Sequence, residues 1–152
     1  MSSIRGTLPG RIVRGVTHQH VEVLRRMFAT YEEAGVEPAL EGVHEDVVIE
    51  IPPEMSAEPD TYRGHDGARC YFAGFDGMLD DVRFEPIELV PVDEGVLAHL
   101  RVSGRGSSSG LDVRLDAFVV TEFADGKIIR MRAYPDRAAA ERAIAGADRP
   151  QT

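Results

Sequence analysis

The second half of the chain contains four consecutive segments in which apolar and polar residues alternate with a period of two. Such alternation is typical of strands that bury one face. It predicts strands at Val82–Val92, Val96–Arg105, Leu111–Phe123 and Lys127–Tyr134. The intervening segments are short and rich in Gly, Asp and Ser, as turns are. Because parallel strands need long crossover connections, these short ones predict an antiparallel meander.

The first half of the chain is patterned mainly for helices. Residues 1–16 contain three Gly and one Pro, and we expect them to form a flexible arm. Thr17 is a suitable N-cap, and Gly35 a suitable end, for a first helix. The apolar residues between them recur at helical spacing: Val21, Leu24, Met27, Phe28 and Tyr31.

Further elements complete the expected order. We predict a short helix at Glu37–Val43, a strand at Asp46–Ile51, a loop over 52–64, a helix from about His65 to Leu79, and a last helix at Arg137–Ala145. Asp136 is placed to cap the last helix, and residues 147–152 form a polar tail. The chain is therefore expected to hold one α+β domain over residues 17–146. Its curved antiparallel sheet would form a cone-like cup with helices packed on the concave face. Such a cup favours binding of a small molecule.

The charge balance disfavours polyanionic partners. Acidic residues outnumber Lys and Arg by 26 to 17, which gives a formal net charge of −9. A nucleic-acid site needs a basic stripe, and an acidic surface is repelled by anionic membranes. The longest apolar run, Ala117–Val120, is far too short to span a bilayer, and no secretory signal is recognisable. We therefore expect a cytoplasmic protein without nucleic-acid or membrane partners.

The metal-binding residue types are few and poorly spaced. Cys70 is the only cysteine, so neither an intrachain disulfide nor a cysteine-based zinc site is expected. His18 and His20 are two residues apart in a predicted helix and would not share a face. The other histidines show no ligand spacing. We expect neither a metal nor a cofactor.

Three segments resemble a known family. They are Tyr62–Gly67 (YRGHDG), Gly104–Gly110 (GRGSSSG) and Asp125–Ala140 (DGKIIRMRAYPDRAAA). With the order of elements, they resemble the nuclear transport factor 2-like superfamily and its SnoaL-like, polyketide cyclase-like branch, over about Thr17–Gly146. The resemblance implies a cystatin-like α+β barrel and a homodimer. The family includes isomerases, cyclases, dehydratases and epoxide hydrolases, so it does not fix an activity.

Two well-known mechanisms of this superfamily are disfavoured. The resemblance implies that the positions of the acid and base groups of ketosteroid isomerase correspond to Ile51, Phe28 (or Met27) and Val119 in this chain. All of these side chains are apolar and cannot act as acid or base. At the positions of limonene-epoxide hydrolase Arg101 is retained, but Ser103 and Ala133 stand where aspartates would be needed. Neither Ser nor Ala can replace a base that activates water.

The strand Val96–Arg105 allows two orientations. Its alternation alone directs Val96, Ala98, Leu100 and Val102 to the core, and the polar set to solvent. The resemblance implies the opposite, with His99, Arg101 and Ser103 facing the cup. In the resembled fold both faces of the sheet are partly covered, by helices on one side and a partner subunit on the other, so either orientation is open. We take the inward one as the working hypothesis, and the alternative is a solvated strand face with surface charges.

The inward orientation makes His99 and Arg101 the candidate catalytic residues. They would lie about 7 Å apart on one face. The guanidinium would favour neutral imidazole, so His99 could act as a general base while Arg101 held an enolate or carbonyl oxygen. The resemblance places the rest of the pocket at Met27, Phe28, Ile49, Ile51, Tyr62, Phe72, Ser103, Val119, Met131 and Ala133.

Two functions follow from these expectations. The first is a cofactor-independent isomerase, cyclase or dehydratase acting on a small, largely apolar carbonyl compound. The alternative is a non-catalytic, dimeric ligand-binding or accessory protein with the same pocket.

Overall fold

A computed structural model describes residues 10–52, 60–92 and 95–147 of the chain. The helices are α1 (Gly10–Ala34), α2 (Val36–Ala39), the short 3-10 helix η1 (Leu40–Gly42), α3 (Gly64–Met78) and α4 (Arg137–Ala147). The strands are β1 (Val43–Ile51), β2 (Asp60–Arg63), β3 (Leu79–Val92), β4 (Gly95–Gly106), β5 (Asp112–Ala124) and β6 (Lys127–Tyr134). The four alternating segments are thus four consecutive strands, as predicted.

The six strands form one curved sheet in the order β2-β1-β6-β5-β4-β3. Strands β3 to β6 form the expected antiparallel meander. The prediction of an all-antiparallel sheet is wrong at one place, because β1 pairs with β6 in parallel, with Ile49 opposite Met131. This pair joins segments about 80 residues apart in the chain, and such a long connection is what parallel pairing requires. Strands β2 and β3 are the two edges, so the described sheet is an open cone rather than a closed barrel.

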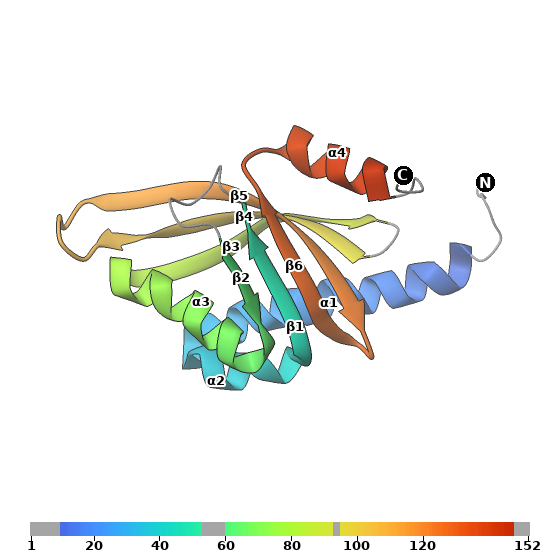
Figure 1. Ribbon diagram of the computed structural model, residues 1–152, viewed down its shortest axis with the longest axis horizontal. Coiled ribbons are helices and arrows are strands. Elements are labelled where there is room, and N and C mark those ends of the chain that lie inside the picture. The colour runs from blue at the N-terminus through green and yellow to red at the C-terminus, as the bar shows by residue number, and fades with distance from the viewer. Residues whose placement is uncertain (1–9, 53–59, 93–94, 148–152) are drawn as a thin grey trace.

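Helices cover the sheet unequally (Figure 1). α1 packs against β3, β4 and β6, and α3 packs against β1, β2 and β3, so both lie on the concave face. α4 packs against β5 and β6, and Figure 1 shows it across the sheet from α1, α2 and α3. The guanidinium of Arg137, at the start of α4, lies 5.5 Å from the centre of the Phe118 ring on the outer face. The expectation of helices on the concave face is therefore met by α1 to α3, and α4 is the exception.

The core lies between the concave face and these helices, and aromatic side chains dominate its centre. Phe84 of β3 contacts four rings, with centroid distances of 5.1–5.8 Å. These rings belong to Phe28 and Tyr31 of α1 and to Phe72 and Phe75 of α3. Phe84 thereby joins the two helices to the edge of the sheet.

Two element boundaries differ from the prediction in a way that bears on organisation. α1 begins at Gly10, so residues 10–16, which were predicted to belong to a flexible arm, are helical. Glycine disfavours a helix by only about 1 kcal/mol, and two glycines did not stop this one. Residues 1–9 lie outside the described part of the chain. The predicted loop over 52–64 contains β2, which pairs with β1.

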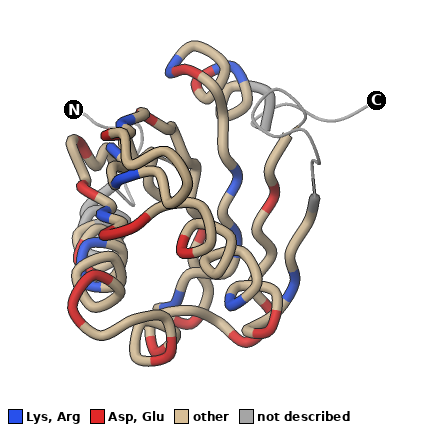
Figure 2. Tube along the Cα trace, turned by 90° about the vertical axis from the view of Figure 1, so that its left-hand side faces the viewer, with Lys and Arg blue, Asp and Glu red and all other residues tan. Residues whose placement is uncertain are grey.

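Charged residues of both signs are interspersed along the described trace (Figure 2). None of the helices in the described ranges is long and apolar enough to cross a membrane.

Candidate functional site

A cavity of about 280 Å³ lies between α3 and the concave face of the sheet. Its floor is made by inward-facing residues of β4, β5 and β6, and α3 forms its roof. The lining residues are Ile51, Tyr62, Tyr71, Gly74, Phe75, Met78, Phe84, Leu100, Val102, Leu115, Ala117, Val119 and Ala133. A narrow recess of about 20 Å³ shares several of these walls and extends toward Phe28, Ile49, Phe72 and Met131. Apart from the two tyrosines, the side chains that line the cavity are therefore apolar.

Two tyrosines supply the polar side-chain atoms of this lining. The rings of Tyr62 and Tyr71 lie with their centroids 5.5 Å apart. Burial, and then the proximity of Tyr62, raises the pKa of the Tyr71 hydroxyl well above its usual range. Tyr71, like any tyrosine at neutral pH, can donate a hydrogen bond, and the raised pKa extends this to alkaline solution. Within the described ranges neither hydroxyl has a hydrogen-bond partner, whereas the Tyr31 hydroxyl donates to Asp76 Oδ1 at 3.0 Å.

The segment Tyr62–Gly67 positions this part of the cavity. His65 donates from Nε2 to the carbonyl oxygen of Val43 at 2.8 Å, which fastens the start of α3 to β1. A Cβ on Gly67 would lie 2.8 Å from the carbonyl carbon of Tyr62, so only glycine allows α3 to pack this closely on β2. The motif thus has a structural role, and it sets Tyr62 beside Tyr71.

Most of the predicted pocket residues lie around this cavity or its recess. The structure brings together Phe28, Ile49, Ile51, Tyr62, Phe72, Val119, Met131 and Ala133. Two others lie elsewhere. Met27 is buried, but it lines a separate cleft between α1, α2 and the β5–β6 turn. Ser103 lies on the outer face of the sheet and lines a different cleft there. Ser103 follows Val102, which faces the core, so the Ser103 side chain points to the opposite face of the sheet. The predicted inward orientation of Ser103 was therefore wrong.

The predicted inward orientation of His99 and Arg101 is also wrong. Ala98 and Leu100 are buried in the core, so the alternate residues of β4 point away from the cavity. His99 stacks on Phe118, with ring centroids 4.5 Å apart. The alternation of β4 was the correct guide to orientation, and the resemblance was not.

His99 and Arg101 do come together, around a carboxylate of the neighbouring strand. His99 Nε2 lies 3.0 Å from Asp116 Oδ2, and Arg101 Nε donates to Asp116 Oδ1 at 3.0 Å. Arg101 first, and His99 second, lower the pKa of the Asp116 carboxyl to about 2. The arrangement is a hydrogen-bonded ion cluster on the outer face, separated from the cavity by the sheet.

The prediction missed several lining residues that the sequence pattern did mark. Tyr71, Phe75 and Met78 belong to the same helical stripe as Phe72. Leu100 and Val102 follow from the alternation of β4 once that alternation is given precedence. The sequence could not predict that the two tyrosine hydroxyls lack hydrogen-bond partners in the described ranges. That depends on which side chains the fold brings close to them.

The acid–base chemistry available to the cavity is limited. The lining residues named above include no carboxylate, imidazole or thiol. The positions that resemble the acid and base positions of ketosteroid isomerase hold Ile51, Val119 and Phe28 (or Met27). Ile51, Val119 and Phe28 face the cavity or its recess, whereas Met27 does not. No group of three His, Cys, Asp or Glu side chains within the described ranges is arranged to hold a metal ion.

Solved structures with the same architecture share this fold over most of the chain. TerC, co-crystallised with polyporic acid, is 25% identical, with a TM-score of 0.68 and coverage of 84% of this chain and 98% of that one. A nuclear transport factor 2-like protein from Burkholderia xenovorans LB400 is 26% identical, with a TM-score of 0.65 and coverage of 84% and 97%. A candidate SnoaL-like polyketide cyclase from Jannaschia sp. CCS1 is 18% identical, with a TM-score of 0.68 and coverage of 97% and 100%.

The sequence comparison agrees with the structural one. No protein of curated function matches the chain. The family model of the SnoaL-like domain matches residues 24–131, which include all six strands except the last residues of β6. The chain therefore belongs to the SnoaL-like domain family, within the nuclear transport factor 2-like superfamily.

Proposed function

We propose that this protein binds a small, largely apolar molecule carrying a carbonyl group in the cavity beneath α3. One observation carries the proposal: an apolar cavity of about 280 Å³ contains two tyrosine hydroxyls without partners in the described part of the chain. An apolar ligand gains from burial, and an unpaired hydroxyl in an apolar wall gains from meeting an acceptor. TerC, whose crystal contains polyporic acid, supports a small organic ligand for this fold.

We expect the carbonyl oxygen of the ligand to accept a hydrogen bond from the Tyr71 hydroxyl. Tyrosine hydroxyls are protonated donors at neutral pH, and burial raises the pKa of Tyr71 further, so it stays a donor in alkaline solution as well. A ligand carbonyl beside it would accept this hydrogen bond, and Tyr62 is close enough to contact the same end of the ligand. The remaining walls select for hydrophobic shape and not for charge.

A second candidate function is cofactor-independent isomerisation, cyclisation or dehydration of the same class of ligand. A neutral tyrosine that donates to a carbonyl oxygen also stabilises the enolate that forms when a proton leaves the neighbouring carbon. No base for that proton is present among the named lining residues. Binding without turnover is therefore the function that we place first.

Binding should be tested with a panel of aromatic and polycyclic ketones and quinones, measured by isothermal titration calorimetry. We expect Tyr71→Phe to lower the affinity for the compounds that bind by about three- to tenfold, which corresponds to the loss of one net hydrogen bond. Tyr134→Phe is the matched control, because Tyr134 contacts Arg132 on the outer face. Ala117→Leu should abolish binding by filling the cavity, and His99→Ala should leave affinity unchanged.

The same compounds should be followed by NMR over time with the wild-type protein. An unchanged spectrum alongside saturable binding would support a binding protein, and a new product would favour the second candidate. If Ala117→Leu binds every compound as tightly as the wild type while remaining folded, the ligands do not occupy this cavity and the proposal is wrong.

The homodimer remains a prediction of the family resemblance, and analytical ultracentrifugation tests it directly. A single species at the monomer mass of 16.7 kDa over the micromolar range would contradict it.

A further inference from the structure

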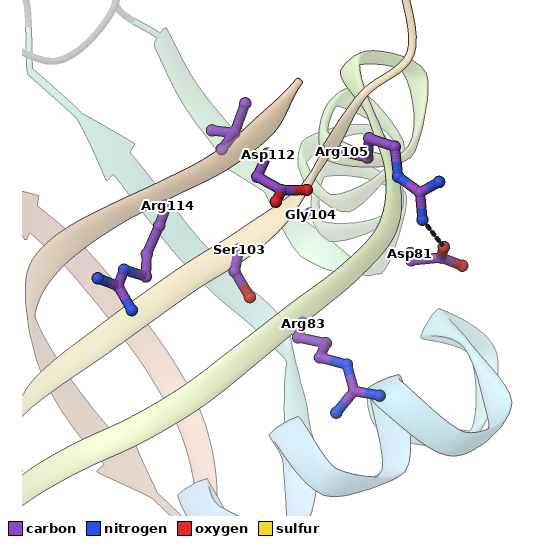
Figure 3. A pocket seen from close by; sticks show the side chains of 8 residues that line it. Asp81, Arg83, Ser103, Gly104, Arg105, Asp112 and Arg114 are labelled. Atoms are coloured by element: carbon purple, nitrogen blue, oxygen red, sulfur yellow. Dashed lines mark hydrogen bonds and ion pairs between the residues drawn. The ribbon is translucent and has the colours of Figure 1, made fainter. Parts of the chain in front are cut away.

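A second cleft, of about 530 Å³, opens on the outer face of the sheet where β3, β4 and β5 run side by side (Figure 3). It is lined by three arginines, Arg83, Arg105 and Arg114, together with Ser103 and two aspartates. The sheet separates it from the cavity beneath α3, and nothing in the proposed function uses it.

The centre of this cleft is a row of three residues across three neighbouring strands. Arg83 of β3 pairs with Ser103 of β4, and Ser103 pairs with Arg114 of β5. Directly paired residues of antiparallel strands lie about 5 Å apart with their side chains on the same face. The small serine therefore lies between two long cationic side chains. Figure 3 shows Arg114 on one side of it and Arg83 on the other, with the Arg83 guanidinium directed toward α1.

The rows on either side of it are composed differently. Each places one arginine between two carboxylates: Glu85, Arg101 and Asp116 in one row, and Asp80, Arg105 and Asp112 in the other. The central row has two arginines and no carboxylate. Positive charge on this part of the sheet is therefore in excess only around Ser103, between Arg83 and Arg114, although the net charge of the whole chain is −9.

The two flanking arginines of the central row also retain unused donors. Arg114 has no hydrogen bond or ion pair within the described ranges. The carboxylate nearest to Arg83 is Glu32, at 3.8 Å, and the Arg83 side chain is 71% exposed. Two of the neighbouring carboxylates are already engaged, because Asp116 binds Arg101 and His99, and Asp81 pairs with Arg105 at 3.3 Å. Asp112, which also lines the cleft, makes no ion pair within the described ranges and lies in the row beside Arg105.

We propose that this cleft binds a small, multiply charged oxyanion, a phosphate or dicarboxylate group, between Arg83 and Arg114 above Ser103. A guanidinium presents paired donors that match the oxygens of phosphate and carboxylate, and two of them can grip one anion from opposite sides. The Ser103 hydroxyl can donate from the floor of the cleft. A neutral or cationic ligand would leave both guanidinium groups unpaired, so the row selects for negative charge.

Isothermal titration calorimetry should be carried out on the full chain with inorganic phosphate, pyrophosphate and succinate, at constant ionic strength because exposed charges are screened by salt. We expect saturable binding of one anion per chain. Arg83→Gln and Arg114→Gln should each weaken it by about tenfold, as expected for loss of a charge-assisted hydrogen bond. A preference for pyrophosphate or for succinate would identify which oxyanion the cleft fits.

Two further variants make the test specific. Ser103→Asp places a carboxylate between the arginines and should abolish anion binding while keeping the protein folded. Arg25→Gln is the matched control, because Arg25 is an exposed arginine of α1 whose only ion pair among the described residues, to Glu22, is 3.8 Å long. It removes the same charge and should leave the affinity unchanged.

Three results would overturn the proposal. No saturable heat with any of the anions would do so, and so would equal weakening by Arg25→Gln, which would indicate an adventitious ion only. The third is a self-associated wild type that Arg83→Gln and Arg114→Gln dissociate in the ultracentrifuge. In that case carboxylates of a second copy, and not a small anion, would be the occupants of the cleft.

Discussion

Arg101 Nε donates a hydrogen bond to Asp116 Oδ1 across 3.0 Å, on the face of the sheet that points away from the cavity. The same carboxylate lies 3.0 Å from His99 Nε2, so one aspartate of β5 organises both residues of β4. This relationship explains why two side chains with catalytic potential have a structural role here. Their donors are directed to a neighbouring strand and not into the ligand cavity.

Replacement of Asp116 should change the acid sensitivity of the protein. Its pKa is about 2 in the folded chain and 3.8 ordinarily, so folding favours the ionised form. The resulting stabilisation is complete above about pH 4 and is lost as the pH falls toward 2. Asp116→Asn should therefore be less stable than the wild type at pH 7, and the difference should shrink between about pH 4 and pH 2. Urea unfolding midpoints over this pH range provide the measurement.

Asp112→Asn is the control for this effect, because Asp112 lies on the same strand and its carboxylate makes no ion pair within the described ranges. It should retain the acid dependence of the wild type. An Asp116→Asn protein whose midpoint falls with acid as steeply as that of the wild type would contradict the assignment.

Truncation of Phe84 should be among the most damaging core substitutions. Its ring is 4% exposed and contacts rings of both α1 and α3. Phe84→Ala should lower the free energy of unfolding by about 3–5 kcal/mol, the usual range for a buried phenylalanine. Phe118→Ala, on the partly covered outer face, should cost clearly less. Equal losses in chemical denaturation would show that the aromatic centre is not the main source of stability.

A methyl group at Gly95 should not be tolerated. Its Cβ would lie 1.8 Å from the carbonyl oxygen of Thr121, a backbone atom that can move only if β4 and β5 separate. Gly95→Ala should therefore lower the melting temperature sharply or prevent folding. Gly77→Ala is the counterpart: apart from its chain neighbours and the backbone of its own helix, no described atom would lie within 4 Å of the added Cβ, so the substitution should stabilise α3 by up to about 1 kcal/mol. Thermal melts of the two variants should shift in opposite directions.

Loss of the cap of α4 should destabilise that helix. Asp136 Oδ1 accepts a hydrogen bond from the backbone N–H of Ala139 at 2.8 Å, as the sequence predicted for an N-cap. Asp136→Ala should cost about 0.5–2 kcal/mol, and Asp136→Asn should keep most of the cap. Hydrogen exchange of the α4 amides should be faster in the alanine variant alone. Unchanged protection in that variant would mean that packing on β5 and β6, and not the cap, holds the helix.

The local pattern of apolar and polar residues was sufficient to predict most of the helices and strands. β6 spans Lys127–Tyr134 as predicted, and β4 differs by one residue at each end, because alternation and turn residues are properties of short segments. The alternation of β4 also gave the correct face for Leu100. The inward placement of His99 failed because it relied on the orientation implied by a resemblance and set that local pattern aside.

Long-range pairing was not accessible in this way. The sequence predicts a loop where β2 lies, because the four residues of β2 become a strand only by pairing with β1. The parallel pair of β1 and β6 likewise depends on segments far apart in the chain. No periodicity within either strand reports the direction of its partner.

By itself the sequence determined the α+β class, the meander of four strands and the apolar character of the cavity wall, because each follows from the spacing of apolar residues along one segment. Only the tertiary structure decided which polar groups meet. It placed Tyr62 beside Tyr71, His99 and Arg101 around Asp116, and Ser103 between two arginines. These encounters depend on strand register and helix docking, which are set by contacts between residues distant in the chain.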